Sequence, residues 1–223
     1  LTVALVFGQT LRFDFVWDDL SLLAANEHLS GPHALRDALT ADFWDSSVRA
    51  WAASGYWRPL VKLSHVLLRA VGGGAAWPFH LFNVMLHALC TLLVAAWARR
   101  RLPGAPGVAA LVAGLVFALH PSRFEVVPWA SASTELLFGA FALTAALAFE
   151  RAPGWPALVA LALAALCKES VLVLPVLLTA DAWLRGGLRA RARWLGGAWV
   201  TVAVAYAARV AAPVPFFGGG APG

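Results

Sequence analysis

Residues 77–98 have the sequence WPFHLFNVMLHALCTLLVAAWA and are followed at once by Arg99, Arg100 and Arg101. An apolar helix of about 20 residues, rising 1.5 Å per residue, crosses a hydrocarbon core of about 30 Å. Inside lipid the backbone must satisfy its hydrogen bonds within the segment, which favours a helix over an open sheet. The stretch therefore predicts a membrane-spanning helix that ends on a basic turn.

The composition of the whole chain indicates the same class of protein. Of its 223 residues, 61% are hydrophobic and 13% are charged, and the mean hydropathy is +0.73. Soluble domains have roughly 45–50% apolar and about 25% charged residues. We therefore predict an all-α, polytopic helical membrane protein. Cys90 and Cys167 lie in apolar runs without ligand-like spacing, which indicates core residues rather than a disulfide framework or a metal site.

Further apolar runs predict spanning helices at residues 108–119, 134–149, 156–166, 171–184 and 194–209. Residues 1–8 are too short to cross a bilayer and are interpreted as the outer end of a first helix, which brings the total to about seven crossings. Residues 213–223 form a tail rich in proline and glycine. We treat 1–223 as a single transmembrane domain truncated at both ends, with a first outer loop at 9–76 and a helical bundle at 77–212.

Short loops rich in arginine mark the cytoplasmic side of a membrane protein. Such loops occur at 99–101, at Arg151 and at 185–193, as strict alternation of the spans requires. The net charge of +5 is therefore attributed to orientation, and no nucleic-acid partner is predicted. The opposite, extracytoplasmic face then carries the long loop, the turn at 120–125, the 168–169 corner and Arg209.

The long first loop holds seven of the twelve acidic residues and two predicted interfacial helices. Leu35, Leu39 and Phe43 recur at helical spacing, and a second helix is expected to start at Arg58-Pro59. The second helix has a basic stripe of Arg58, Lys62, His65 and Arg69. The stripe either extends to lipid headgroups or attracts the phosphate of a lipid-linked substrate.

Ionisable side chains from four separate segments gather on the predicted outer face. They are the carboxylates Asp18, Asp19, Glu125 and Glu169, the cations Arg123, Lys168 and Arg209, and His120. Charged groups near membrane depth are costly and usually mark functional sites. We therefore predict a polar cavity centred on Asp18 and Asp19. Alternatives are that the two aspartates only order the loop and that Lys168 and Glu169 form a structural ion pair.

His80, Asn83 and His87 lie on one face of the first complete span, with His80 nearest the predicted cavity. Neutral imidazole is a common metal ligand, and contact with a phosphate is a further interpretation of this face. Polar side chains in a span also form hydrogen bonds between helices. These interpretations stay open from the sequence, and a divalent cation is the one cofactor that is considered.

Five segments resemble, in order, the signature segments of one family. They are FVWDD at 15–19, YWRPL at 56–60, FHLFNVMLH at 79–87, FALHP with EVVPW between 117 and 129, and Lys168-Glu169. The family is that of the bacterial relatives of the transmembrane and tetratricopeptide-repeat O-mannosyltransferases, in the GT-C superfamily of glycosyltransferases that use polyprenyl-phosphate sugars. The resemblance implies a GT-C-like bundle, a catalytic aspartate in the first outer loop, and further membrane helices that are often followed by tetratricopeptide repeats.

Two positions depart from the family pattern. Arg123 stands where a second histidine is common, and Ser133-Thr134 stands where the next helix often opens with Gly-Arg. The second departure removes one candidate donor contact, for which Arg123 is a nearby substitute.

The chemistry that the resemblance implies needs a base and a cationic cradle. Either Asp18 or Asp19 fits the base that activates a hydroxyl acceptor, of which protein serine or threonine is one candidate. The donor-phosphate residues are predicted to be Lys168, Arg209, Arg58 and Arg123, with His120, Glu125, Glu169, His80 and Asn83 in support. Transfer from polyprenyl phosphate would invert the sugar, at the outer face of a bacterial inner membrane and in contact with its lipids. A transporter or a non-catalytic membrane scaffold is the alternative.

Overall fold

The computed structural model describes residues 1–45 and 54–212, and the regular structure in these two ranges is entirely helical. The all-α prediction is confirmed. The predicted tail at 213–223 lies outside the described residues.

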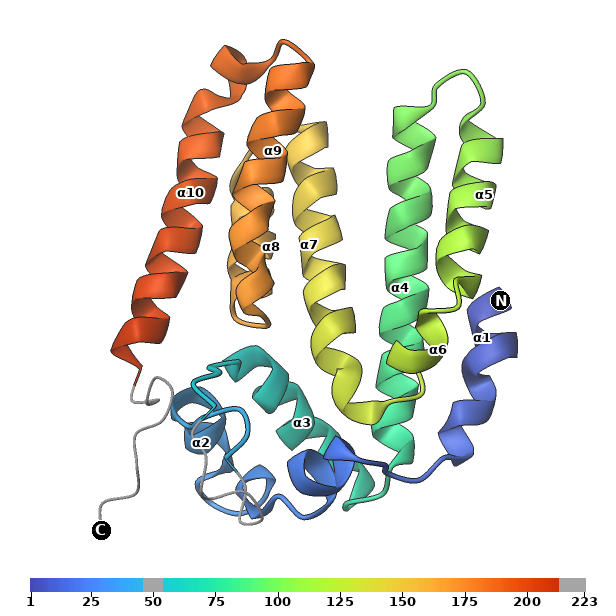
Figure 1. The fold of residues 1–223 in the computed structure, drawn as a ribbon, viewed down its shortest axis with the longest axis vertical. Helices are drawn as coiled ribbons and strands as arrows, with labels where there is room; N and C mark the ends of the chain where they lie inside the picture. The colour runs from blue at the N-terminus through green and yellow to red at the C-terminus, as the bar shows by residue number, and fades with distance from the viewer. Residues whose placement is uncertain (46–53, 213–223) are drawn as a thin grey trace.

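Six helices run side by side along the long axis of the molecule (Figure 1). They are α4 (Trp77–Arg101), α5 (Pro106–Leu119), α7 (Ser133–Arg151), α8 (Trp155–Ala165), α9 (Val173–Leu184) and α10 (Leu188–Ala211). Proline occupies the first turn of α4, α5 and α8, where its missing N–H leaves no bond unmade. Helix α4 packs against α5 and α7, α7 against α8, and α10 against α8 and α9.

Three segments are long and apolar enough to cross a membrane: Trp77–Arg101, Ala130–Arg151 and Leu188–Ala211. The shorter apolar helix α8 packs between α7 and α10, and α5 flanks α4 on the other side (Figure 1). The chain is therefore an integral membrane protein. Of the predicted spans, only these three reach full spanning length among the described residues.

The first loop gathers at one end of the bundle as a layer of short helices (Figure 1). In chain order they are η1 (Gly8–Arg12), η2 (Leu20–Ala24), η3 (Glu27–Leu29), α2 (Ala34–Thr40) and α3 (Pro59–Gly72). Helix α1 (Thr2–Phe7) comes before them and packs against α4 and α5. The connectors α6 (Arg123–Val126), η4 (Ala130–Ala132) and η5 (Glu169–Leu172) lie at the same end. The arginine-rich turns after α4, α7 and α9 lie at the other end, as the alternation of spans predicted.

The basic stripe of α3 points into the protein. Lys62 is 2% exposed and its Nζ donates to the carbonyl of Asp42 at 2.9 Å. His65 is buried, and its Nε2 lies 2.8 Å from Oγ of Ser133 at the start of α7. The interpretation that these side chains extend to lipid headgroups is therefore wrong, because both serve as hydrogen-bonding partners inside the fold. Leu67 is instead on the exposed face, where it suits a membrane interface.

The predicted surface helix of the loop is confirmed in part. Helix α2 ends at Thr40, and Leu35 and Leu39 are exposed on it. Phe43 lies beyond the helix and is buried in the main core. The apparent helical repeat therefore combines an exposed helix face with an anchor residue in the following turn.

Ion pairs tie the helices together at the arginine-rich end. Arg101 reaches Glu150 at the end of α7 (Nε to Oε1, 3.1 Å) and Asp181 on α9 (Nη1 to Oδ1, 2.7 Å). Arg185 adds a second contact to Asp181 at 3.0 Å. Arginine at this end thus joins helices to one another through ion pairs, in addition to its predicted role in orientation.

The two-sided arrangement predicts a labelling pattern in sealed membranes. Leu20→Cys and Phe124→Cys should react with an impermeant thiol reagent from outside, and Ala190→Cys should react only after permeabilisation. Native Cys90 and Cys167 are 2% and 0% exposed, so unsubstituted protein serves as the background control. The reverse pattern would contradict the predicted orientation.

The buried His65 predicts a pH-dependent stability. Burial, with the nearby charge of Lys62, lowers the pKa of His65 to about 3. Because the unfolded chain takes up a proton near pH 6.5 and the folded chain does not, stability is constant above pH 6.5 and falls as the pH drops towards 3. The expected loss is about 1.4 kcal/mol per pH unit below 6.5. Thermal unfolding in detergent between pH 7.5 and 5 measures it, and His65→Gln should flatten the profile.

Candidate functional site

Asp19 joins the first loop to the start of α7 through hydrogen bonds to the backbone. Its side chain is fully buried. Oδ1 accepts from the N–H of Ser131 at 2.8 Å, and Oδ2 accepts from the N–H groups of Ala130 and Val16, each at 3.3 Å. Backbone N–H groups at a helix start carry partial positive charge and favour a carboxylate. Asp19 is thus committed to holding two segments together.

Asp18 lies beside it in a tight turn with an unusual backbone. The turn is closed by the N–H of Asp19 donating to the carbonyl of Val16 at 2.9 Å. Trp17 has φ +49°, a left-handed conformation that is uncommon for a bulky side chain and costs about 1–2 kcal/mol. The turn leaves Trp17 76% exposed and Asp18 half-buried. Strained backbone of this kind clusters at functional sites.

The polar face of α4 holds the connection between α6 and α7. Asn83 Nδ2 lies 2.8 Å from the carbonyl of Trp129, and 3.4 and 3.3 Å from those of Val127 and Ala130. One ring nitrogen of His87, Nε2, lies 3.1 Å from the carbonyl of Ala118. These contacts favour the hydrogen-bonding interpretation of this face.

His80 is fully buried, with its ring edge-on to Phe13 at a centroid distance of 6.3 Å. Across residues 1–45 and 54–212, no group of three histidine, cysteine, aspartate or glutamate side chains is arranged to hold a metal ion. The metal interpretation of the His80 face therefore gains no support from the described geometry.

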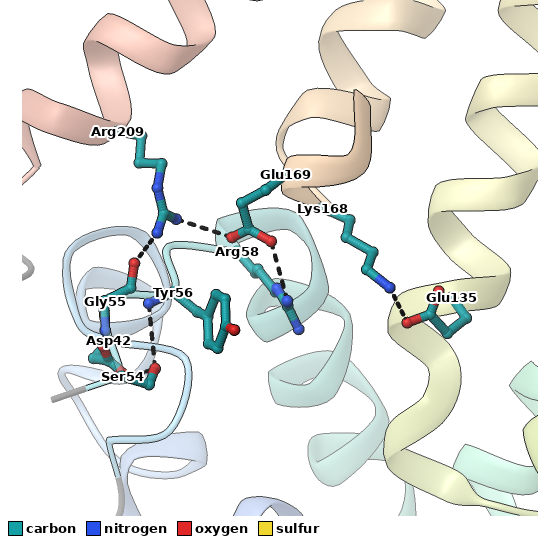
Figure 2. A network of polar contacts seen from close by, with 9 residues as sticks. All are labelled: Asp42, Ser54, Gly55, Tyr56, Arg58, Glu135, Lys168, Glu169 and Arg209. Atoms are coloured by element: carbon teal, nitrogen blue, oxygen red, sulfur yellow. Dashed lines mark hydrogen bonds and ion pairs between the residues drawn. The ribbon is translucent and has the colours of Figure 1, made fainter. Parts of the chain in front are cut away.

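Glu169 joins two of the predicted phosphate-binding arginines, as Figure 2 shows. Its Oε2 pairs with Nη2 of Arg58 at 3.0 Å and its Oε1 with Nη1 of Arg209 at 2.9 Å. Arg209 also donates to the carbonyl of Gly55. The guanidinium of Arg58 lies 4.5 Å from the ring centre of Tyr56. The loop, η5 and the end of α10 therefore meet at one carboxylate.

Lys168 pairs with Glu135 in the first turn of α7 (Figure 2). The hypothesis of a Lys168–Glu169 ion pair is thus wrong, because these neighbouring side chains reach different partners. Glu135 was missed as a site residue. An acidic residue at the outer end of an otherwise apolar span is the signal that could have found it.

The three cations of this cluster, Arg58, Lys168 and Arg209, face two carboxylates, Glu135 and Glu169. Each of these three cations is therefore paired with a carboxylate. Asp42 lies close by, because it accepts from the N–H of Gly55, the residue whose carbonyl Arg209 contacts.

The turn at 120–125 lies at the same end of the bundle but makes its own contacts. His120 is exposed, and its Nδ1 lies 2.8 Å from Oγ of Ser122. Arg123 donates to the same oxygen at 3.0 Å and lies 5.0 Å from the ring centre of Phe117. Glu125 is exposed. Within the described residues, the recorded hydrogen bonds and ion pairs do not link this turn to Asp19 or Glu169. The predicted single pocket is therefore not found as one connected network.

A cavity of about 830 Å³ lies among α4, α7 and α9. Arg123 and Glu135 line it near the loop end of the bundle, and Arg101 and Asp181 line it near the arginine-rich end. Its walls are mainly apolar side chains such as Phe138. A smaller cavity of about 30 Å³ lies against Glu169, Arg209 and Trp57. The large cavity suits an apolar chain, whereas the small one has room for water only.

Comparison with known proteins finds relatives that share one kind of name. Protein O-mannosyl-transferase Tmtc1 of Drosophila melanogaster is 37% identical over 174 residues, which is 75% of this chain and 20% of the relative. Tmtc2 of the same organism is 39% identical over 55% of this chain and 13% of the relative. TMTC3 of Mus musculus is 28% identical over 75% of this chain and 19% of the relative.

These relatives confirm the resemblance that the ordered motifs predicted. The chain spans about a fifth of the length, or less, of the curated relatives it matches. No protein-family model matches the chain, and no solved structure matches it either.

The bridging position of Glu169 predicts a specific loss of stability. Glu169→Gln would leave Arg58 and Arg209 facing each other with one neutral partner, and we expect it to lower the free energy of unfolding by about 1–2 kcal/mol, since the three side chains are partly exposed. Thermal unfolding in detergent measures the change. Glu27→Gln, at an exposed position, is the control and should change stability by less than about 0.5 kcal/mol. Equal effects of the two variants would contradict the bridging role.

Proposed function

We propose that this chain forms the membrane-embedded catalytic part of a glycosyltransferase. It would move a sugar, in the first instance mannose, from a polyprenyl-phosphate donor to a hydroxyl group of a protein acceptor at the extracytoplasmic face. The names of the relatives support a mannosyl transfer to protein. The observation that carries the site assignment is the different setting of two adjacent aspartates. Asp19 is buried and accepts hydrogen bonds from the backbone, whereas Asp18 beside it is half-buried.

Asp18 is the proposed base. A general base must come within hydrogen-bond reach of the acceptor hydroxyl, and Asp18 is open to solvent in part. Asp19 cannot take this role without releasing the N–H groups of Ala130 and Ser131. We therefore assign Asp19 to holding the loop and Asp18 to accepting the proton.

The cluster of Arg58, Lys168 and Arg209 is the proposed site for the donor phosphate. As the bond from the sugar to the phosphate breaks, the leaving lipid phosphate gains negative charge, which Arg58, Arg209 and Lys168 can stabilise. Arginine offers a bidentate fork and lysine a compact charge. Arg123 is the proposed additional cation at the end of the large cavity that also holds Glu135.

The large cavity is the proposed site of the isoprenoid chain of the donor. Its apolar walls suit a hydrocarbon, and its polar end at Arg123 and Glu135 is next to Lys168 through the Lys168–Glu135 pair. The same binding mode would place the sugar on the loop side of the bundle, where Asp18 lies.

The reaction is a single displacement. The acceptor oxygen forms a bond to the anomeric carbon, Asp18 takes the hydroxyl proton, and the bond from that carbon to the phosphate oxygen breaks with its electron pair leaving on phosphate. One displacement inverts the configuration of the sugar. Exposed Leu35 and Leu39 on α2 are suited to contact membrane lipid beside the site.

The proposed side of the membrane follows from the arginine-rich turns at the opposite end of the bundle. The bacterial inner membrane stays a prediction from the sequence motifs, since the relatives named above come from fly and mouse.

Substitution of the two aspartates should separate the roles. With the protein in lipid vesicles and polyprenyl-phosphate mannose as donor, Asp18→Asn should reduce release of free polyprenyl phosphate by at least about 10²-fold, because the base is lost. Its thermal stability should stay near that of the wild type. Asp19→Asn should lower stability by about 1–3 kcal/mol, because the amide gives the facing N–H groups fewer acceptors.

The two variants also show which outcomes would contradict the assignment. Normal turnover of Asp18→Asn would show that Asp18 is not the base. Unchanged stability of Asp19→Asn would show that Asp19 does not hold the loop to the start of α7. Normal turnover when both aspartates are replaced would remove the glycosyltransferase proposal itself.

A further inference from the structure

We infer that Asn83, a buried residue of the first complete span, is a positioning residue for the proposed base Asp18. The inference rests on the proposed function for its catalytic consequence, and on hydrogen bonds alone for its structural part. The sequence motifs indicated only a supporting role for Asn83 near the donor phosphate, and a role in holding Asp18 goes beyond that.

The first link runs from α4 to the connection before α7. Asn83 is 0% exposed, and its amide nitrogen faces the carbonyl oxygens of Val127, Trp129 and Ala130. These contacts from one NH₂ group tie the connection at residues 127–130 to α4. The carbonyls of Trp129 and Ala130 also accept from the N–H groups of Ala132 and Ser133, so a side chain without an N–H donor would remove the tie to α4 while the local turn keeps its own bonds.

The second link runs from that connection to the first loop. The same stretch turns the N–H groups of Ala130 and Ser131 towards the carboxylate of Asp19. Asp19 then closes the turn by accepting from the N–H of Val16. The position of the turn therefore depends on where Asn83 holds the 127–130 backbone.

The third link is the strain in the turn itself. Trp17 is held at φ +49°, which a free chain would leave for an ordinary conformation. Its ring packs edge-on to Trp129 at a centroid distance of 6.0 Å, and Trp129 is the residue whose carbonyl makes the shortest contact with Asn83. Two contacts to one stretch, through Asp19 and through Trp17, hold Asp18 in its half-buried position.

The consequence for catalysis is specific. Loss of the hydrogen bonds from Asn83 to the 127–130 backbone would let the turn at residues 16–19 relax and move Asp18 away from the acceptor hydroxyl. A displacement of about 1 Å can lower turnover by about 10²-fold. Arg58, Glu169 and Arg209, at the proposed phosphate site, are not among the residues that link Asn83 to Asp18. The expected signature is a lower kcat with an unchanged KM for the donor.

The first experiment is independent of activity. In Asn83→Leu, hydrogen exchange of the amides of Ala130 and Ser131 and of residues 15–19 should become faster, while the body of α7 exchanges as before. Thr91→Val is the matched control on the same helix, because the Thr91 hydroxyl donates only to the His87 carbonyl of its own helix. Unchanged exchange at 130–131 would overturn the inference, even if transfer is never detected. If Asn83→Leu does not accumulate, Asn83→Asp, which keeps the size of the side chain, is measured in its place.

The second experiment measures transfer from polyprenyl-phosphate mannose in lipid vesicles. Asn83→Leu should lower kcat by about 10- to 100-fold at constant donor KM. Asn83→Gln, which keeps the amide donor, should recover part of the loss. A raised donor KM with normal kcat, or no difference between Leu and Gln, would contradict positioning.

A double substitution tests whether Asn83 acts through Asp19. Because the two residues hold the same stretch, Asn83→Leu combined with Asp19→Asn should lose no more activity than the more damaging single change. If the fold-losses in activity of the two single variants multiply in the double variant, the residues act independently, and the inference that Asn83 acts through Asp19 is overturned. Absence of transfer in the wild type would count against the proposed function. Hydrogen exchange at residues 130–131 would then still test whether Asn83 holds the turn.

Discussion

The fold depends on the burial of one carboxylate where the first loop meets the bundle. A charged group removed from water is costly unless hydrogen bonds replace its hydration. Asp19 meets this condition with three backbone N–H groups, two of them at the start of the segment that becomes α7. These bonds join parts of the chain more than 100 residues apart, as the sequence separations of 111 and 112 show. The layer of short helices is thereby fixed to the spans instead of lying loosely on the membrane.

The remaining polar contacts at this end extend the same principle. His65 joins α3 to Ser133, Lys168 joins the 168–169 corner to Glu135, and Glu169 joins Arg58 to Arg209. Each contact pairs a residue of one segment with a residue of another segment far away in sequence. Because lipid offers no hydrogen bonds, polar groups at the edge of a membrane domain find their partners inside the protein. The charged side chains therefore gather where the segments meet.

The first long span and the grouping of the arginine-rich turns at one end of the bundle could be predicted from the sequence, because both depend on composition along the chain. The span expected at 77–98 is found at Trp77–Arg101, and the arginine-rich turns lie together. The inward direction of Lys62 and His65 could not be predicted in this way. An amphipathic pattern gives two faces without saying which one meets protein, and in α3 the apolar Leu67 faces outward.

The partners of individual charges also needed the structure. Lys168 has Glu169 beside it in sequence but pairs with Glu135, since side-chain direction at a helix corner decides the contact. Asp18 and Asp19 are chemically identical in the sequence. The N–H groups of Ala130 and Ser131, which lie more than 100 residues away, bind Asp19, and nothing local to the motif indicates that these groups are there.

The carboxylates that face the proposed phosphate-binding cations are compatible with that role. Three unpaired cations close together near the membrane would repel one another, with an energy of about 4 kcal/mol for two charges 4 Å apart at an effective dielectric constant near 20. Glu135 and Glu169 remove most of this repulsion while the site is empty and hold the cations in place. In the proposed reaction the leaving phosphate gains negative charge as its bond to the sugar breaks. The cations would then stabilise the transition state more than the bound donor, which is the difference that accelerates a reaction.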